Sequence, residues 1–315
     1  MRLYIFLQIM KKNRTYTGDQ ICRSLLQKAV RRGAVDVAES ATIHLIQKGE
    51  TGWLKNRLGV ITFEETWALS GEIQFTTNEE LLIKQYKKLA SSSKNKDAAG
   101  LGSLGYELSK GARSILEKND PSNKHIKIIA EAVRRPDDFW QWVKRLKSDQ
   151  EARAFLEKAE IGFKLAGWPW DKAFAIASAY LFAIDDLPVV TTFGSLPTPN
   201  FPFWVAIDKH TSTGKNALVK CAKRFNLNKS TLGWIQFYLE SAKCANLQPS
   251  QWWEREKLWR LEAEGVDHDK AEIIWRDSSS FLHELLCSQE TALKNELTHS
   301  SNLYQSTLKT QGNLI

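Results

Sequence analysis

Apolar residues recur three and four positions apart along almost the whole chain, the spacing that places them on one face of an α-helix. Ile21, Leu25 and Ala29 follow this spacing, and Gly33 then interrupts it. Further helices are predicted over residues 35–48, 51–70, 79–90, 107–118, 122–134, 137–147, 150–165, 170–184, 212–225, 229–245, 249–263 and 267–297. We therefore predict an all-α fold built from many helices.

Two segments interrupt the helical pattern. Residues 91–97 read SSSKNKD and are entirely polar, so an exposed loop is predicted. Residues 187–202 contain four prolines and one glycine but are largely apolar. A long apolar loop of this kind packs on a domain surface, lines a site or marks a domain boundary.

A third segment, residues 97–106, is rich in small residues and contains Gly100, Gly102 and Gly105 in a GxGxxG pattern. That pattern binds dinucleotide phosphates where a strand precedes it. A polar segment precedes it in this chain. We therefore expect these glycines to allow close packing of helices.

The chain is moderately basic. Its 44 Lys and Arg residues against 36 Asp and Glu give a net charge of +8 and a pI near 9.2. This excess favours an acidic partner, of which nucleic acid is the commonest. Because acidic residues are interspersed along nearly the whole chain, an ordinary basic surface is the alternative. Hydrophobic residues make up 43%, enough for a sizeable core.

Cysteine usage and hydropathy predict a cytoplasmic protein. The four cysteines lack CxxC spacing, so they suggest neither a zinc site nor a disulfide framework. No apolar run approaches the length of a transmembrane helix, so no membrane partner is expected. In the first 14 residues the apolar run precedes the basic residues, the reverse of a signal peptide. We expect a strand or helix there that packs on the body of the protein.

Two groups of basic residues are candidate nucleic-acid contacts. Lys28, Arg31 and Arg32 stand at i, i+3 and i+4, so they form a basic stripe on one face of a helix. Cations in the last turn also complement the helix dipole, which is the alternative interpretation. The second group lies on the helix predicted over residues 212–225 and comprises Lys215, Lys220 and Arg224.

Asp208, Lys209 and His210 lie between the proline-rich segment and the helix predicted over residues 212–225. A helix N-terminus attracts anions, so this corner could bind phosphate, with Lys209 as a further nucleic-acid contact. Asp208 and His210 could instead form a catalytic pair. A capping turn with a surface histidine is the third interpretation.

Asp185 and Asp186 end one predicted helix, where carboxylates oppose the helix dipole. This position predicts a nearby Lys or Arg, or a divalent metal. With Asp208 and Glu240 these carboxylates could hold Mg²⁺. The catalytic candidates are therefore Asp185, Asp186, Asp208 and His210. No cofactor is expected otherwise, and Mg²⁺ is expected only if the protein is an enzyme.

Trp252 and Trp253 are adjacent on a helix that also carries basic residues. Neighbouring helix positions point in different directions, so at least one of these rings is expected off the core face. Such rings can stack on unpaired bases or anchor an interaction. Core or inter-domain packing is the alternative.

The residues with the most specific pattern lie near the N-terminus. Residues 25–33 read LLQKAVRRG, residues 35–38 read VDVA and residues 44–50 read HLIQKGE. This order resembles the start of the C-terminal helical region in replication-associated recombination ATPases of the RarA (MgsA) and WRN-interacting type. Arg57-Leu58 and Glu64-Glu65 stand in roughly the places of that family's next helix. The resemblance covers residues 20–67.

The resemblance implies a collar like that of clamp loaders, which oligomerises, usually as a tetramer, behind an ATPase domain. This chain departs from the family because it contains no GxxxxGK[ST] motif. The closest stretch, residues 212–216, reads STGKN and lacks the leading glycine and the final Ser or Thr. We therefore expect a collar-like protein without an ATPase motor of its own.

These patterns predict a collar-like helical domain over residues 1–118, a helical continuation over 119–186, a C-terminal helical domain over 187–297 and a frayed tail over 298–315. The expected function is that of a non-enzymatic, DNA-associated accessory protein of replication, repair or recombination. Its expected partners are DNA, a separate ATPase or replication protein, and further copies of itself. A metal-dependent enzyme acting on nucleic acid or another phosphate ester near residues 185–211 is one alternative. A protein-interaction scaffold is the other.

Overall fold

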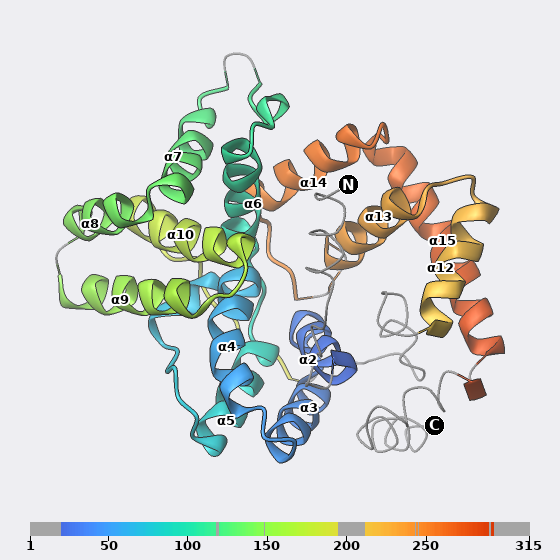
Figure 1. Cartoon of the computed structure of the whole chain (residues 1–315), viewed down its shortest axis with the longest axis horizontal. Helices are drawn as coiled ribbons and strands as arrows, with labels where there is room; N and C mark the ends of the chain where they lie inside the picture. The colour runs from blue at the N-terminus through green and yellow to red at the C-terminus, as the bar shows by residue number, and fades with distance from the viewer. Residues whose placement is uncertain are drawn as a thin grey trace, which may run out of the picture.

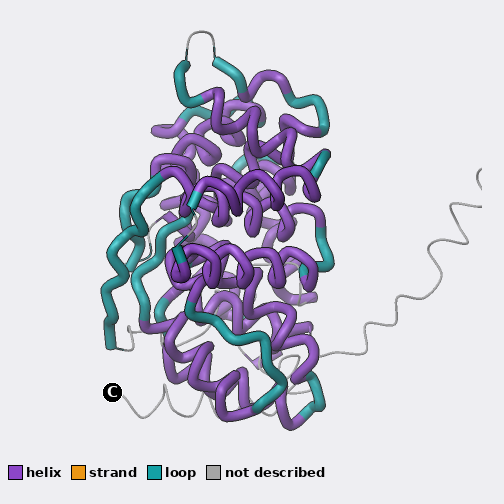
Figure 2. Tube along the Cα trace, turned by 90° about the vertical axis from the view of Figure 1, so that its left-hand side faces the viewer, coloured by secondary structure: helices purple, strands orange, loops and turns teal. Residues whose placement is uncertain are grey.

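The computed structural model describes residues 20–117, 120–147, 149–194, 212–242, 244, 246–289 and 291–292. Over these residues the chain is built from helices and loops, without a sheet, so the predicted all-α fold is confirmed (Figures 1 and 2). The α-helices are α2 (Gln20–Arg32), α3 (Val35–Gln47), α4 (Thr51–Glu65), α5 (Glu79–Ser91), α6 (Asp97–Ser109), α7 (Asn123–Arg134), α8 (Pro136–Leu146), α9 (Gln150–Leu165), α10 (Pro169–Ile184), α12 (Ser212–Arg224), α13 (Lys229–Ala242), α14 (Gln251–Ala263) and α15 (His268–Ser288).

The first core lies around α2, α3 and α5. Leu25, Leu26 and Leu45 are fully buried in it. Leu218 of α12 and Leu282 of α15 belong to the same cluster, so segments far apart in the sequence share this core. In Figure 1, α12 to α15 lie together on the right-hand side.

Glycine ends these helices by a specific backbone conformation. After α2 and α3, Gly33 and Gly49 adopt φ angles of 73° and 76°, in the left-handed region that favours glycine. The predicted interruption at Gly33 and closure at Gly49 are thus confirmed. The prediction of a helix over residues 107–118 is wrong beyond residue 109, where α6 ends. Gly111, at φ 104°, follows the end of α6, and only a short 3₁₀ helix, Arg113–Ile115, comes after it.

The second core lies around α6, which packs against α7, α10 and α14. A Cβ at Gly100 would lie 2.3 Å from the backbone of Trp252, and one at Gly105 would lie 2.4 Å from the side chain of Ile129. At Gly102 it would lie 2.8 Å from the carbonyl oxygen of Ala173. The three glycines of the GxGxxG pattern therefore allow neighbouring helices to approach α6, as predicted.

The prediction that residues 91–97 form an exposed loop is wrong. Residues 92–96 are all buried, and Lys94 and Lys96 are 0% exposed. We call residues 92–96 the crossing segment. Their polar backbone and side-chain groups form hydrogen bonds and ion pairs inside the protein. Lys94 N–H donates to the carbonyl of Asn246 at 2.8 Å, and Asn95 N–H donates to that of Glu65 at 2.9 Å.

The proline-rich loop is non-helical over its described part, residues 187–194. It runs beside the start of the crossing segment, where Ser93 N–H donates to the carbonyl of Thr191 at 2.7 Å. Residues 195–202 lie outside the described part of the chain. Within that part, no helix combines the length and the apolar character that a bilayer span requires.

Replacing Gly100 by alanine tests the close approach of α6 and α14. Because the added Cβ would meet backbone rather than a flexible side chain, we expect Gly100→Ala to lower the free energy of unfolding by about 1–3 kcal/mol or more. Gly233→Ala is the matched control, since nothing lies within 4 Å of its Cβ. In that helix interior the change should be neutral or stabilising by up to about 1 kcal/mol. Urea unfolding measures both, and equal effects of the two substitutions would contradict the packing.

Candidate functional site

The predicted basic stripe on α2 is only partly exposed to solvent. Arg31 is 8% exposed and forms ion pairs with Glu64 at 3.0 Å and Glu65 at 2.8 Å. Lys28 and Arg32 are partly buried. The expected stripe is therefore not continuous on the surface. Arg31 is buried because its guanidinium forms ion pairs that join α2 to α4.

Glu65 is the centre of a buried ionic network. Its carboxylate lies 3.0 Å from the ammonium of Lys96 and 2.8 Å from the guanidinium of Arg31. Burial raises the pKa of Glu65, but the charges of Lys96 and Arg31 outweigh it and hold the pKa at about 2. The carboxylate is therefore ionised at neutral pH and neutralises cations from two other elements.

Lys94 is buried beside this network. Its ammonium donates to the carbonyls of Leu89, Ala90 and Ser92, at the C-terminal end of α5. These carbonyls carry the negative end of the helix dipole and favour the charged form. Burial lowers the pKa of Lys94 to about 7, and the charge of Glu65 opposes that change. Lys94 thus serves as an internal cap for α5.

The second predicted basic group lies on a surface with no acidic neighbours in sequence. Residues 212–239 contain no Asp or Glu. The apolar side of α12 is buried, through Ala217, Leu218 and Cys221. The opposite side, which we call the basic face of α12, continues to the first residue of α13. Its exposed cations are Lys215, Lys220, Lys223, Arg224 and Lys229.

Three predicted site residues, Asp208, Lys209 and His210, lie outside the described residues. Asp185 and Asp186 are exposed at the end of α10. The predicted nearby cation is Lys147, whose ammonium donates to the backbone carbonyls of Phe182 at 2.6 Å and Asp185 at 3.4 Å. Over the part of the chain that the structure describes, no three His, Cys, Asp or Glu side chains are grouped to hold a metal ion.

Trp252 and Trp253 are both buried, at 5% and 3% exposure. The expectation that one of the two rings lies off the core is therefore corrected, and the interpretation that the rings pack in the core is confirmed. Two different cores meet at this point of α14. Trp252 packs in the core around α6, whereas Trp253 joins Ala99 and Tyr238 in a separate cluster.

Trp253 also lines a cavity of about 270 Å³, which we call the aromatic cavity. Helices α4, α6, α10, α13 and α14 contribute its walls. The lining residues are Glu64, Ala99, Ser103, Trp170, Phe174, Trp234, Phe237, Tyr238, Trp253 and Arg260. Sequence reasoning missed this site. The i, i+3, i+4 spacing of Trp234, Phe237 and Tyr238 indicates one shared helix face, but it does not indicate which other helices that face meets.

The charged groups beside the aromatic cavity are paired. Arg260 lies 2.7 Å from Glu256 and 3.1 Å from Glu107. The hydroxyl of Tyr238 donates to Glu256 as well. Burial raises the pKa of Glu256, against the opposing effect of Arg260, and burial also raises the pKa of Tyr238. These pairs fix the walls of the cavity and leave little net charge for a ligand.

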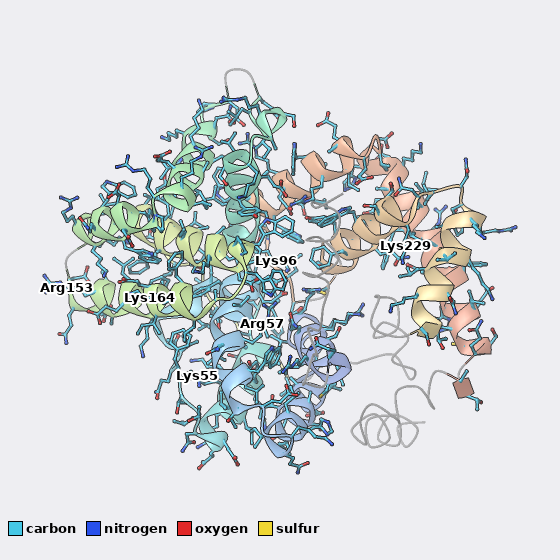
Figure 3. The ribbon with its side chains drawn as sticks, viewed as in Figure 1. Lys55, Arg57, Lys96, Arg153, Lys164 and Lys229 are labelled. Atoms are coloured by element: carbon cyan, nitrogen blue, oxygen red, sulfur yellow. The ribbon has the colours of Figure 1, made fainter. Side chains whose placement is uncertain are left out.

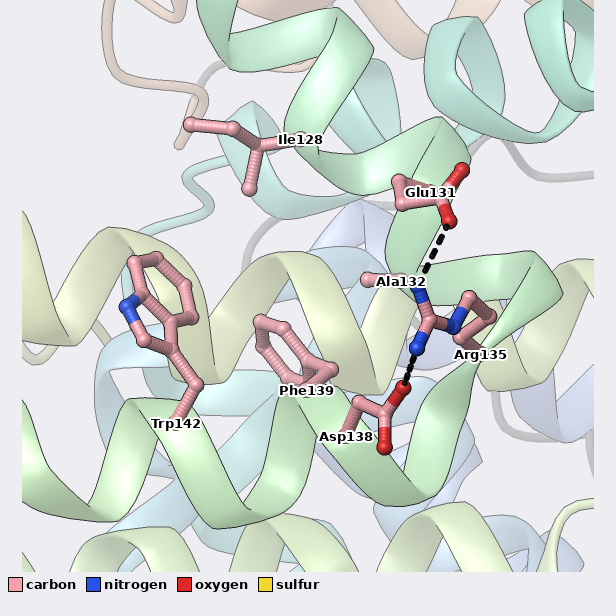
Figure 4. Close-up of a pocket in the computed structure, with 7 residues that line it drawn as sticks. All are labelled: Ile128, Glu131, Ala132, Arg135, Asp138, Phe139 and Trp142. Carbon is pink, nitrogen blue, oxygen red and sulfur yellow. Dashed lines mark ion pairs between the residues drawn. The ribbon is translucent and has the colours of Figure 1, made fainter.

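A second hollow, of about 250 Å³, lies on the surface between α7 and α8 (Figure 4). Ile128, Phe139 and Trp142 form its apolar part. At its edge Arg135 forms ion pairs with Glu131 and Asp138. This hollow thus combines an apolar floor with one cation, Arg135, that is already neutralised by carboxylates. The aromatic cavity brings together more rings.

Comparison with known proteins adds no relative: no family model, no curated protein and no solved structure matches this chain.

Removing the charge of Glu65 tests the buried network. We expect Glu65→Gln to lower the free energy of unfolding by about 3–5 kcal/mol, because it leaves Lys96 buried without its counter-charge. Glu80→Gln is the matched control. Glu80 pairs with Lys84 on the exposed surface of α5, so its loss should change stability little. Chemical unfolding at pH 7 measures the difference, and similar small effects for both would contradict the network.

The same network predicts an acid transition. The folded-state pKa of Glu65 is about 2, below the ordinary value of 4.5, so folding favours the ionised form. Its stabilisation is complete above about pH 4.5 and is lost as the pH falls towards 2. Unfolding free energies measured between pH 6 and 2 should fall more steeply in the wild type than in Glu65→Gln. Parallel curves would show that Glu65 does not titrate in this way.

Proposed function

We propose that this protein is a non-enzymatic, nucleic-acid-binding accessory factor, which contacts phosphates through the basic face of α12. The observation that carries the proposal is the set of five exposed cations over residues 212–239, a segment without acidic residues. Phosphate binding by Lys and Arg releases counterions and needs no particular base sequence. One side of a helix held by its apolar face to the core is suited to this contact.

The wider role within the proposal is in DNA replication, repair or recombination, in the cytoplasm. The resemblance of residues 20–67 to the collar of recombination ATPases supports it. Within the proposal, the chain acts with a separate ATPase or replication protein and assembles with further copies of itself. Arg31 and Glu65, both inside the resembling segment, form an internal ion pair that stabilises its helices.

The enzyme alternative stays a prediction. Two of its four candidate residues, Asp208 and His210, are not described by the structure, and Asp185 and Asp186 are exposed. The scaffold alternative also stays a prediction. Because Trp252 and Trp253 are buried in this structure, a partner could use them only after α14 had moved.

The salt dependence of binding tests the basic face. We expect the triple variant Lys220→Gln, Lys223→Gln and Arg224→Gln to bind a labelled single-stranded oligonucleotide more weakly. The slope of log affinity against log salt should become shallower by about 0.7 for each lost phosphate contact. Fluorescence anisotropy at several salt concentrations gives both quantities.

A triple variant of α9 is the matched control for charge. Arg153→Gln, Lys158→Gln and Lys164→Gln remove the same number of cations from a helix that also carries Glu151, Glu157 and Glu160. Arg153 and Lys164 lie on the opposite side of the molecule from Lys229 (Figure 3). We expect this variant to keep the wild-type slope. If both triple variants reduced the slope equally, the contact would not be specific to the basic face of α12.

A further inference from the structure

We propose that the aromatic cavity binds a single nucleobase. One source of that base is a nucleic-acid strand, and this part of the inference rests on the proposed function. A free nucleoside is the other source, and the chemistry that recognises the two is the same.

The shape of the cavity suits a planar ring. Its floor is buried and includes Tyr238 and Trp253, whose ring centroids are 5.0 Å apart. Trp170, Phe174 and Trp234 are partly exposed, so these rings form a rim through which a ligand can enter. A volume of about 270 Å³ lies at the small end for ligand sites, in the range of one ring system. Contact between aromatic side chains and bases is favourable and tolerates any base.

Two buried donors in the lining lack acceptors. The indole N–H groups of Trp170 and Trp253 have no hydrogen-bond partner among the described residues. A buried donor without an acceptor destabilises the protein. Nucleobases carry carbonyl oxygens and ring nitrogens that accept hydrogen bonds in the plane of the ring. These two N–H groups are themselves buried, so a base could accept from them once a ring of the lining had turned toward it, whereas a hydrocarbon could not accept at all.

The charges argue against a cationic ligand, the other common occupant of an aromatic cage. The guanidinium of Arg260 lies 4.5 Å from the ring centroid of Trp234 and 5.1 Å from that of Trp170. The protein's own cation therefore already uses these rings. The carboxylate of Glu64 is paired with Arg31 at 3.0 Å. A neutral ring fits this environment better than a second cation.

Helix α13 connects the cavity to the basic face. Lys229 is its first residue and is exposed, whereas Phe237 lines the cavity eight positions later. That separation is about 12 Å along the helix axis, at 1.5 Å per residue. Gly233 lies between them on the exposed side, with nothing within 4 Å of a Cβ at that position. A single strand can thus follow α13 from its phosphate contacts to the cavity.

The test uses the full chain with adenosine, cytidine, choline and an oligodeoxythymidylate. Saturation-transfer NMR detects the small molecules, and fluorescence anisotropy detects the labelled oligonucleotide. Trp234→Leu removes a ring from the rim, and Ser103→Leu fills the cavity from α6. Trp142→Leu is the matched control, because it removes a half-buried tryptophan from the hollow between α7 and α8. Far-UV circular dichroism confirms that each variant is folded.

We expect both nucleosides to bind, and Trp234→Leu and Ser103→Leu to weaken that binding by about tenfold or more, with Trp142→Leu unchanged. If the same variants weaken oligonucleotide binding, the base comes from a strand. If they weaken nucleoside binding alone, the source is a free nucleoside and the cavity assignment stands.

Other outcomes separate this inference from the proposed function. If no nucleoside binds and the oligonucleotide responds to the α12 variant but not to the cavity variants, the cavity inference is overturned and the proposed function stands. If nucleosides bind at the cavity while the α12 variant binds the oligonucleotide normally, the cavity inference stands and the basic face is overturned. Binding of choline without binding of either nucleoside also overturns the inference.

Discussion

The ionic network around Glu65 is the constraint on which the rest of the structure depends. Lys96 and Glu65 are 0% and 1% exposed, so each loses the hydration of a full charge on folding. Their separation of 3.0 Å, together with the pair between Glu65 and Arg31, offsets that loss only if all three side chains are held in place. The network therefore favours one arrangement of α2, α4 and the crossing segment over others that are equally apolar.

That arrangement also sets the position of the aromatic cavity. Lys96 directly precedes α6, and its ammonium lies 4.6 Å from the ring centroid of Trp253 in the cavity floor. Its backbone N–H donates to the hydroxyl of Ser250 at 2.9 Å, just before α14 begins. Gly100, one turn into α6, then allows the backbone of α14 to approach closely. One buried lysine thus fixes two of the helices that form the cavity.

Most of the helices were predictable from the sequence because their causes are local. Apolar spacing and the glycines at 33 and 49 determine where α2 and α3 lie and end. The glycines of α6 were predictable as packing positions, though their partners were not. The crossing segment was predicted wrongly because serines and lysines are usually exposed, and the partner of Lys96 lies 31 positions away at Glu65. Arg31 was misjudged for the same reason. The aromatic cavity is lined by residues of five helices. The spacing of residues within one helix does not predict that these helices meet.

Burial also changes how the net charge of the chain bears on function. Arg31 and Lys96 contribute to the positive total, but their charges are used in ion pairs inside the protein. Residues 212–239 carry five cations and no acidic residue, against a total of +8 for the whole chain. A moderately basic composition, with acidic residues interspersed elsewhere, therefore includes one segment whose charged residues are all cations. Because an electrostatic contact depends on local rather than total charge, the basic face of α12 is a surface that would attract a polyanion.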